Sequence, residues 1–225
     1  NIEPNEKNNC FCLCTRNLQC SDLIGQIKPC PKSDKKNNNE ILKFIPGFLV
    51  DAIEKGKTVV LDCINEANAT VGERLNGLLD KKNNEDEEYF DLPEDSEHLK
   101  IKIHKNFRMI CTCNINNLKD MSPAFVNRFD VIVLDPPTFS NSKKTATTLD
   151  INRDWPLLVR NCMSLLSSKG VLYFSTNSRR LKFEPGLLSD FIGFEDFKIL
   201  EITDSTIPED YRNIKIHRAW KIVKS

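Results

Sequence analysis

The stretch Val131-Ile132-Val133-Leu134-Asp135-Pro136-Pro137-Thr138-Phe139 decides the fold of the second half of the chain. Its four leading apolar residues are typical of a buried β-strand of the kind that parallel sheets contain. The two prolines that follow cannot donate a backbone hydrogen bond to a neighbouring strand, so the strand ends before them. Asp135 therefore lies at the carboxyl end of the strand, where sheets of parallel strands bind their ligands.

Patterns typical of strands and helices alternate along the rest of this half. Helices are expected over about residues 150–167 and 187–192, and strands at 130–134, 171–175, 197–202 and 219–223. Alternation of this kind indicates a doubly wound sheet that helices cover on both faces. We expect residues 130–225 to form a four-stranded half-sheet, in which Asp135 lies close to Ser175 and Asn177.

The first half contains a second apolar strand that ends in an acidic residue. Thr58–Leu61 precedes Asp62, and a helix is expected before this strand at Phe48–Ile53. Apolar residues at helical spacing between Val71 and Leu79 predict another helix after it. The arms of a hairpin are expected at Tyr89–Leu92 and Leu99–His104, and a buried strand at Phe107–Cys113. The first half is therefore expected to be α/β as well.

The composition is that of an ordinary globular protein. The chain has 225 residues, of which 40% are hydrophobic and 28% charged, and its formal net charge is zero. Residues 1–133 carry 18 Lys and Arg against 21 Asp and Glu, whereas residues 134–225 carry 14 against 11. The small basic excess of the second half is compatible with a phosphate-rich partner and equally with ordinary surface charge.

The sequence shows neither a membrane span nor an export signal. A spanning helix needs about 18 successive apolar residues, and no stretch approaches that length. We therefore expect no membrane partner and a cytoplasmic location. The polar N-terminus begins with Asn1 rather than methionine, and we expect the chain to be a fragment.

The nine cysteines are an odd number without an export signal, which favours reduced thiols and no disulfide partner. Cys10, Cys12, Cys14 and Cys20 invite a zinc hypothesis, although their spacing lacks the paired C-x2-C pattern of zinc knuckles. Cysteines at every second position also suit one face of a strand, where cysteine behaves as a small hydrophobic residue. Both interpretations stay open.

The stretch from Thr58 to Ala67 resembles a Walker B strand, in which an aspartate holds Mg²⁺. Six more segments follow the order seen in midasin-like (dynein-related) AAA+ ATPases, namely residues 21–29, 73–80, 93–94, 104–108, 111–114 and 122–129. The resemblance implies ATP and Mg²⁺ as ligands. It implies that Asp62 holds the metal, that Asn114 orients the attacking water, and that Arg128 reaches the nucleotide of a neighbouring subunit.

Two features depart from this ATPase pattern. The chain contains no G-x4-G-K-[ST] loop, which cradles the phosphates in such enzymes. Cys63 stands where a glutamate normally polarises the attacking water. We therefore expect a degenerate or truncated AAA+ core that does not hydrolyse ATP.

Residues 129–225 resemble the C-terminal part of bacterial large-subunit ribosomal RNA methyltransferases of the Rossmann-like class. The similarity is close to the half of the bifunctional 23S rRNA guanine methyltransferases that methylates guanine N7. It is carried by residues 135–143, 150–154, 174–180, 206–213 and 216–220. It implies S-adenosylmethionine as cofactor and ribosomal RNA as partner. The catalytic base pocket would consist of Asp135, Pro136, Pro137 and Phe139.

The chemistry of this turn agrees with that resemblance. The N7 lone pair of guanine is already nucleophilic, so methyl transfer needs alignment more than a general base. Asp135 and the neighbouring carbonyl groups can accept hydrogen bonds from a base edge, and Phe139 can stack on an extruded base. Lys143, Arg179 and Arg180 follow strand ends and are expected to bind RNA phosphates. The plainer alternative is that Asp-Pro-Pro only ends a strand.

The expected fold class is α/β, with a partial Rossmann-like methyltransferase sheet preceded by a partial AAA+ P-loop-type core. We expect an AAA+-like remnant with a polar linker at 1–40, a partial ATPase-like domain at 41–129 and the methyltransferase half at 130–225. Since ATPase-like sequence stands where the cofactor-binding strands would be, the methyltransferase is expected to be incomplete. The alternatives are an AAA+ ATPase fragment, with a nuclear location, and a non-functional fusion of both.

Overall fold

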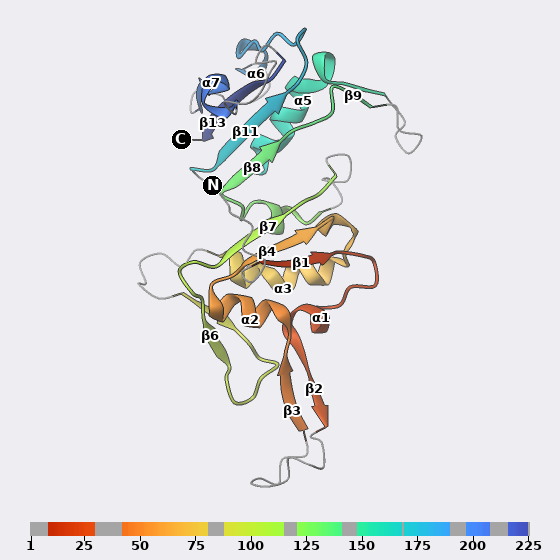
Figure 1. The fold of residues 1–225 in the computed structure, drawn as a ribbon, viewed down its shortest axis with the longest axis vertical. Helices are drawn as coiled ribbons and strands as arrows, with labels where there is room; N and C mark the ends of the chain where they lie inside the picture. The colour runs from red at the N-terminus through yellow and green to blue at the C-terminus, as the bar shows by residue number, and fades with distance from the viewer. Residues whose placement is uncertain are drawn as a thin grey trace. The chain divides into compact units, whose positions relative to one another are not determined.

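The computed structural model describes residues 9–29, 42–80, 88–114, 121–140, 148–167, 169–189, 197–207 and 216–224. The chain divides into two compact units, Asn1–Phe125 and Val126–Ser225 (Figure 1). The expected junction between residues 129 and 130 lies close to this division. No helix within the described ranges is long and apolar enough to cross a membrane.

The first unit is built on a three-stranded parallel sheet with the order β1-β4-β7. Its strands are β1 (Asn9–Leu13), β4 (Thr58–Asp62) and β7 (Arg108–Cys111). The helices of the unit are α1 (Cys20–Ile24), α2 (Phe48–Lys55), the short 3-10 helix η2 (Ile64–Glu66), α3 (Ala69–Leu79) and α4 (Pro123–Val126), whose last residue belongs to the second unit. The expected helices and central strands of this half are confirmed.

Two helix ends in this unit follow directly from the sequence. Helix α2 ends at Gly56, which adopts the left-handed conformation with φ 67°. A Cβ atom there would stand 2.1 Å from the His104 ring, so glycine is required both by conformation and by space. Helix α3 begins at Asn68, whose side chain accepts the N–H of Thr70 at 3.1 Å.

Two antiparallel hairpins complete the first unit. The pair β5 (Tyr89–Asp91) and β6 (Lys100–Lys102) was expected from the sequence. The pair β2 (Gly25–Pro29) and β3 (Leu42–Pro46) was not. The alternation of apolar residues in β2 and β3 is weak because most of their side chains are exposed. A strand pair without a buried face leaves little periodicity in a sequence.

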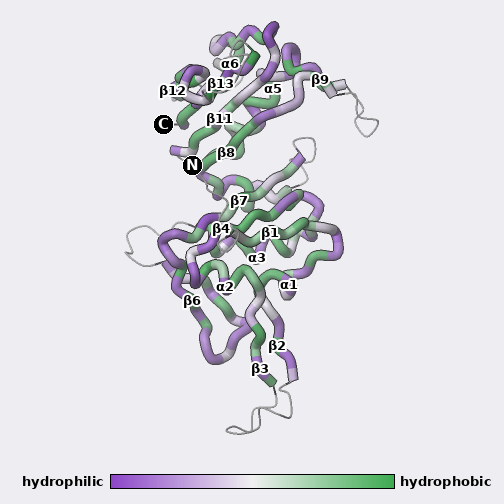
Figure 2. Tube along the Cα trace, viewed as in Figure 1, coloured by the Kyte–Doolittle hydropathy of each residue, from purple (hydrophilic) through white to green (hydrophobic). Residues whose placement is uncertain are grey.

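The second unit contains a four-stranded sheet with the order β12-β13-β11-β8. The strands are β8 (Val131–Leu134), β11 (Val171–Thr176), β12 (Phe197–Glu201) and β13 (Arg218–Lys224). The helices are α5 (Ile151–Ser164), α6 (Gly186–Ser189) and α7 (Thr203–Thr206), and a small hairpin pairs β9 (Phe139–Ser140) with β10 (Leu149–Asp150). Strands β8 and β11 are parallel and, in Figure 2, largely hydrophobic. The expected half-sheet is confirmed, and its fold class is α/β.

The core of the second unit is aromatic. The Phe183 ring lies between Trp155 and Trp220, with ring centroids 4.6 Å and 4.4 Å away. Phe174 of β11 stacks on Trp220 at 5.4 Å. Trp155, Phe174 and Trp220 are all at most 2% exposed. These rings hold α5 against the middle of the sheet, since large buried aromatic side chains dominate core energetics.

The expectation that helices cover both faces of this sheet is wrong for the described residues. Val131, Val133 and Leu200 are 51%, 70% and 62% exposed, on the face opposite the aromatic core. Lys221 lies over the Tyr173 ring at 6.0 Å on the same face. The reason is topological: α5 packs on β8 and β11, and α6 packs on α5, so both helices lie on one face.

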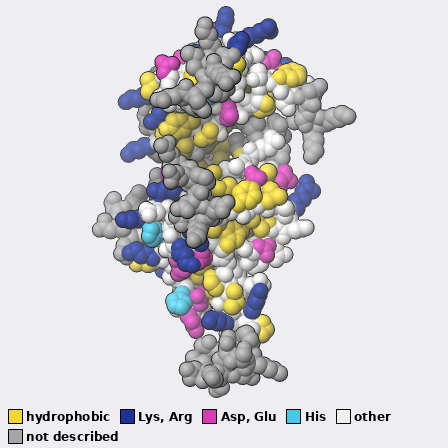
Figure 3. Space-filling model, viewed as in Figure 1, with side chains coloured by type: hydrophobic (Ala, Val, Ile, Leu, Met, Phe, Trp, Pro, Cys, Tyr) yellow, Lys and Arg dark blue, Asp and Glu magenta, His cyan; other side chains and the backbone are white. Residues whose placement is uncertain are grey.

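A similar uncovered face occurs in the first unit. Phe11 and Leu13 of β1 and Ile110 of β7 are 69%, 57% and 44% exposed. Figure 3 shows hydrophobic side chains gathered over β1 and β4 on the viewed face. The opposite face of β4 is closed, because Val59 and Leu61 are fully buried.

Replacing Phe174 by alanine should destabilise the second unit by about 3–5 kcal/mol, because it removes a buried ring from the stack. The two tryptophans of the chain, Trp155 and Trp220, both lie in this unit, so the urea dependence of tryptophan fluorescence reports its unfolding alone. Leu200→Ala, at an exposed site, is the control and should stay within about 0.5 kcal/mol. Equal effects of the two variants would contradict the aromatic core.

Candidate functional site

The carboxyl ends of β8 and β11 bring two polar side chains together. The register pairs Leu134 with Phe174, so the residues that follow these two are neighbours. Ser175 Oγ donates a hydrogen bond to Asp135 Oδ1 at 2.7 Å. The expectation that Asp135 lies close to Ser175 is confirmed.

The chain leaves Asp135 through the two prolines and enters the β9–β10 hairpin. Phe139 begins β9 and pairs with Asp150 of β10. The N–H of Ile151, at the start of α5, donates to the carbonyl oxygen of Thr138 at 3.2 Å. The Phe139 side chain is 62% exposed. An aromatic ring therefore stands in solvent a few residues from Asp135.

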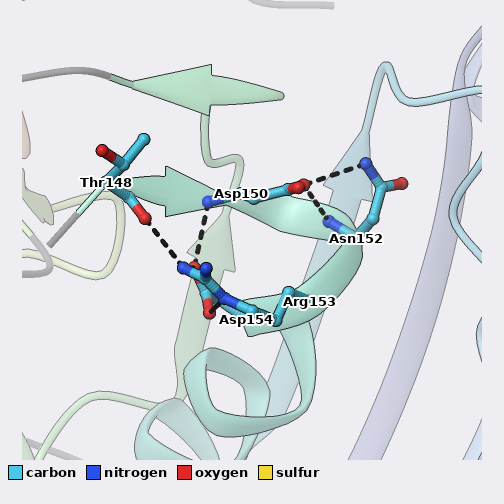
Figure 4. Close-up of polar contacts among 5 residues, drawn as sticks. All are labelled: Thr148, Asp150, Asn152, Arg153 and Asp154. Carbon is cyan, nitrogen blue, oxygen red and sulfur yellow. Dashed lines mark hydrogen bonds and ion pairs between the residues drawn. The ribbon is translucent and has the colours of Figure 1, made fainter.

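A polar network joins the base of this hairpin to the first turn of α5 (Figure 4). Asp150 caps the helix by accepting the Asn152 N–H at 3.0 Å, and its own N–H donates to Asp154 Oδ2 at 2.9 Å. Arg153 donates to both carboxylate oxygens of Asp154, at 2.7 and 2.9 Å, and to the Thr148 carbonyl oxygen at 2.8 Å. Residues 150–154 form a motif in the sequence, but no role for them was predicted.

A second network ties α5 to the end of β11. Ser178, which is 4% exposed, donates from Oγ to Asn152 Oδ1 at 2.7 Å. Its N–H donates to Oγ1 of Thr176, which is fully buried, at 3.1 Å. Beside it, Asn177 Oδ1 lies 3.3 Å from His217 Nδ1. His217 was not predicted as a site residue, although its place in the motif at residues 216–220 was a signal.

The residues expected to bind RNA are placed only in part. Arg179 and Arg180 follow β11 and are exposed. The N–H of Arg180 donates to Ser178 Oγ at 3.4 Å, which anchors the backbone of this pair. Lys143 lies outside the described residues. Two of the three cations therefore lie at the same strand ends as Asp135.

In the first unit, Asp62 and Asn114 follow neighbouring parallel strands. Thr112, which follows β7, contacts the end of β4: its Oγ1 donates to Asp62 Oδ1 at 2.5 Å and accepts the Cys63 N–H at 3.0 Å. The Asn114 N–H donates to Asn65 Oδ1 at 3.2 Å. Arg128, the third residue expected at an ATP site, belongs to the second unit.

Several cysteines lie near Asp62. Burial raises the pKa of the Cys14 thiol to about 12, and the nearby Cys12, Cys63 and Asp62 raise it further. Burial likewise raises the pKa of Cys111 to about 12. Thiols with pKa values this high are protonated at physiological pH, so they do not supply a general base.

The zinc hypothesis for Cys10, Cys12, Cys14 and Cys20 is wrong. The described residues contain no group of three or more His, Cys, Asp or Glu side chains that could hold a metal ion. Cys20 instead donates to the Thr70 carbonyl oxygen at 3.5 Å. The alternative, cysteines on one face of a strand, is confirmed.

Comparison with known proteins separates the two halves. Residues 6–129 match the family model of the AAA domain (dynein-related subfamily). Ribosomal RNA large subunit methyltransferase K of Neisseria meningitidis serogroup B is 47% identical over 95 residues, 42% of this chain and 25% of that protein. Methyltransferase K/L of Legionella pneumophila (strain Corby) is 50% identical over 98 residues, 43% of this chain and 13% of its own length. The chain thus spans a quarter or less of these curated relatives.

Solved structures resemble the chain only distantly. A candidate methyltransferase complexed with SAH shares 16% identity at a TM-score of 0.35, covering 78% of this chain and 42% of its own. A candidate ATPase from Cytophaga hutchinsonii shares 18% identity at a TM-score of 0.36, covering 55% and 32%.

The hydrogen bonds from Arg153 hold the pKa of the Asp154 carboxyl below its ordinary value. A carboxyl whose pKa is lower in the folded state stabilises the fold above its unfolded pKa, about 3.9, and less as the pH falls through its folded pKa. In Asp154→Asn, the free energy of unfolding of the second unit should therefore decrease less than in the unmodified chain as the pH is lowered into the acid range. Tryptophan fluorescence in urea measures this free energy at each pH. Asp204→Asn, at an exposed carboxylate of α7, is the control. If the free energy of unfolding of Asp154→Asn decreased with falling pH as steeply as that of the unmodified chain, the role of the ion pair would be contradicted.

Proposed function

The chain belongs, through residues 6–129, to the dynein-related AAA domain family. We propose that the functional site lies in the remaining, C-terminal part of the chain, and that this part is the base-presenting half of an S-adenosylmethionine-dependent rRNA (guanine) methyltransferase. The observation that carries the proposal is the hydrogen bond between Ser175 and Asp135 at the carboxyl edge of the sheet. It fixes an acceptor at the place where doubly wound sheets bind ligands. Close to 50% identity to rRNA methyltransferases over this region supports it.

Asp135 is proposed to read the edge of the target base. A carboxylate group offers about four lone-pair sites, so the hydrogen bond that Ser175 makes within the described residues leaves room for donors from the base. The amino group of guanine is such a donor. The carbonyl oxygens of Pro136 and Pro137 are further hydrogen-bond acceptors at this turn.

Phe139 is proposed to stack on the base after it leaves its helix. Its ring is largely in solvent, so it does not contribute much to the core, and bases that leave a stack are commonly held on aromatic rings. Guanine N7 already carries a nucleophilic lone pair. The chain therefore needs to align the base, and no side chain needs to remove a proton.

Arg179, Arg180 and Lys143 are proposed to hold the RNA backbone. Both arginines are exposed directly after β11, so they can approach phosphates from the edge at which Asp135 lies. Contacts of this kind position an RNA without reading its sequence. The proposed partner is thus ribosomal RNA, bound by base contacts at the turn and phosphate contacts beside it.

The described residues do not by themselves fit S-adenosylmethionine. In doubly wound sheets the cofactor lies in the crevice where the strand order reverses, between two halves of the sheet. In the described sheet β8 is the last strand on its side, so only one wall of such a crevice is present.

We propose that residues 130–225 are the C-terminal half of a methyltransferase domain, and that residues 1–40 and 41–129 form the AAA-like remnant and partial ATPase domain. A cytoplasmic location is proposed from the bacterial relatives, which give a nuclear one no support.

A second candidate function is that of an AAA+ ATPase fragment. It is favoured by Asp62 and Asn114, which lie at the ends of adjacent parallel strands, where Asp62 accepts from Thr112 and the Asn114 N–H donates to Asn65. A carboxylate at such a strand end would hold Mg²⁺, which itself binds phosphate oxygens. However, the Asp62 carboxylate accepts from the Thr112 hydroxyl, and Cys63 replaces the acid that polarises water. The residues therefore do not fit a hydrolytic site, and a fusion in which neither half is active is the remaining alternative.

The chain alone should bind 23S rRNA but not methylate it. Arg179→Ala/Arg180→Ala should weaken binding and lower the slope of log affinity against log salt by about 1.4–1.8, because two phosphate contacts are lost. Lys198→Ala, on the exposed edge of β12, is the matched control. Filter binding at several salt concentrations measures both quantities. Unchanged binding by the double variant would contradict the proposed RNA contacts.

Methyl transfer is tested with tritiated S-adenosylmethionine. We expect no label in 23S rRNA and no effect of the cofactor on unfolding of the second unit, because only one of the two walls of the cofactor crevice is present in the described sheet. Adding the segment that precedes the matched residues in the Neisseria methyltransferase should restore labelling that depends on Asp135. Cofactor-induced stabilisation with label in guanine from the chain alone would make it a complete enzyme.

ATP hydrolysis by the 225-residue chain should be undetectable, because it lacks the phosphate-loop motif and has Cys63 in place of an acid. Such groups provide most of the electrostatic stabilisation in phosphoryl transfer. Phosphate release with Mg²⁺ is compared between the chain and Asp62→Ala. A magnesium-dependent rate that disappears in Asp62→Ala would establish the ATPase alternative.

A further inference from the structure

The exposed ring of Phe139 stands on a support that is too small to hold it by itself. The β9–β10 pair has two residues in each strand, and isolated hairpins are at best marginally stable in water. With 62% of its side chain exposed, Phe139 is not fixed by burial either. Something else must therefore hold this ring in one orientation if it is to stack on a base.

Contacts with the first turn of α5 provide that support. The Asp150 residue that pairs with Phe139 donates its N–H to Asp154 Oδ2 at 2.9 Å. On the other side of the hairpin, the Ile151 N–H donates to the Thr138 carbonyl oxygen at 3.2 Å. Strand β10 thus runs directly into α5, and strand β9 is tied to the same helix start through Thr138, the residue before Phe139.

Arg153 braces this arrangement. Its guanidinium donates to both oxygens of Asp154 and to the carbonyl oxygen of Thr148, which directly precedes β10. Adjacent residues of a helix do not face each other, so this is not an ordinary pair that stabilises a helix surface. The Arg153 side chain is directed along the returning strand of the hairpin, where its third hydrogen bond is made (Figure 4).

We propose that Asp154 and Arg153 are positioning residues, which act through the β9–β10 hairpin to hold the Phe139 ring beside Asp135 for stacking on the target base. This inference rests on the proposed function of the second unit. The two prolines between Asp135 and Phe139 fix φ and limit motion from the other direction. A ring that is ordered before binding loses less conformational freedom when the base arrives.

A purely structural role for Asp154 would also be reasonable, because an acid in the first turn of a helix interacts favourably with its dipole. The two roles differ in their dependence on Phe139. If Asp154 only stabilises α5, its loss should affect RNA binding equally with and without the Phe139 ring. If it positions the ring, its loss should matter only while the ring is there.

A double-mutant cycle on the full chain separates these cases, with affinity for 23S rRNA as the readout. Phe139→Ala should weaken binding about tenfold, because one stacking contact is lost. Asp154→Ala should weaken binding severalfold in the chain with Phe139 and not measurably in Phe139→Ala. Glu201→Ala, which breaks the ion pair with Arg218 at 3.2 Å in the same unit, is the matched control and should not couple to Phe139.

Tryptophan fluorescence in urea checks that each variant is folded under binding conditions. Should Asp154→Ala fail to fold, Arg153→Ala replaces it in the cycle, because that side chain is 65% exposed and its removal leaves no cavity. Additive effects of Phe139 and the α5 residues would overturn the inference while leaving the proposed function in place. Both the inference and the proposed function would be overturned if the unmodified chain did not bind the RNA, or if Phe139→Ala bound the RNA as tightly as the unmodified chain does.

Discussion

The second unit depends on the parallel pairing of β8 with β11. This pairing requires a crossover connection, and the chain makes it with α5 on one face of the sheet. The same register brings the ends of the two strands level, so that Ser175 reaches Asp135 at 2.7 Å. The first turn of α5, into which the hairpin leads, is tied to the residues after β11 by the hydrogen bond from Ser178 to Asn152. Sheet pairing, helix packing and the candidate base pocket are therefore consequences of one strand register.

Local sequence patterns predicted much of this arrangement. Four apolar residues followed by two prolines are sufficient to locate the end of β8, because proline cannot take part in a sheet interior. The apolar spacing of α5 and its polar N-terminal residues predict the helix. Asp135 was therefore placed correctly at a strand end, and the order of motifs along the sequence was sufficient to separate the two halves of the chain.

Other features have no local signal. That β13 lies between β11 and β12, antiparallel to both, depends on which strand edges remain open after folding. The roles of Arg153 and Asp154 depend on the short strand β10, which leads directly into α5 and which no sequence pattern predicted. The zinc hypothesis failed for a related reason, since the spacing of cysteines along a chain does not show whether a strand keeps them apart. The folded geometry, rather than a sequence pattern, decides these cases.

The two edges of the second sheet differ in how they meet solvent. At one edge, β12 carries exposed Lys198 and Glu201, and charged side chains discourage the addition of another strand. At the other edge β8 consists of four apolar residues, and in the described part of the chain no strand pairs with its outer side. Such an edge is a template for intermolecular β-pairing, so solubility during expression should depend on protein concentration. Lysine in place of the exposed Val133 would protect the edge without touching the aromatic core.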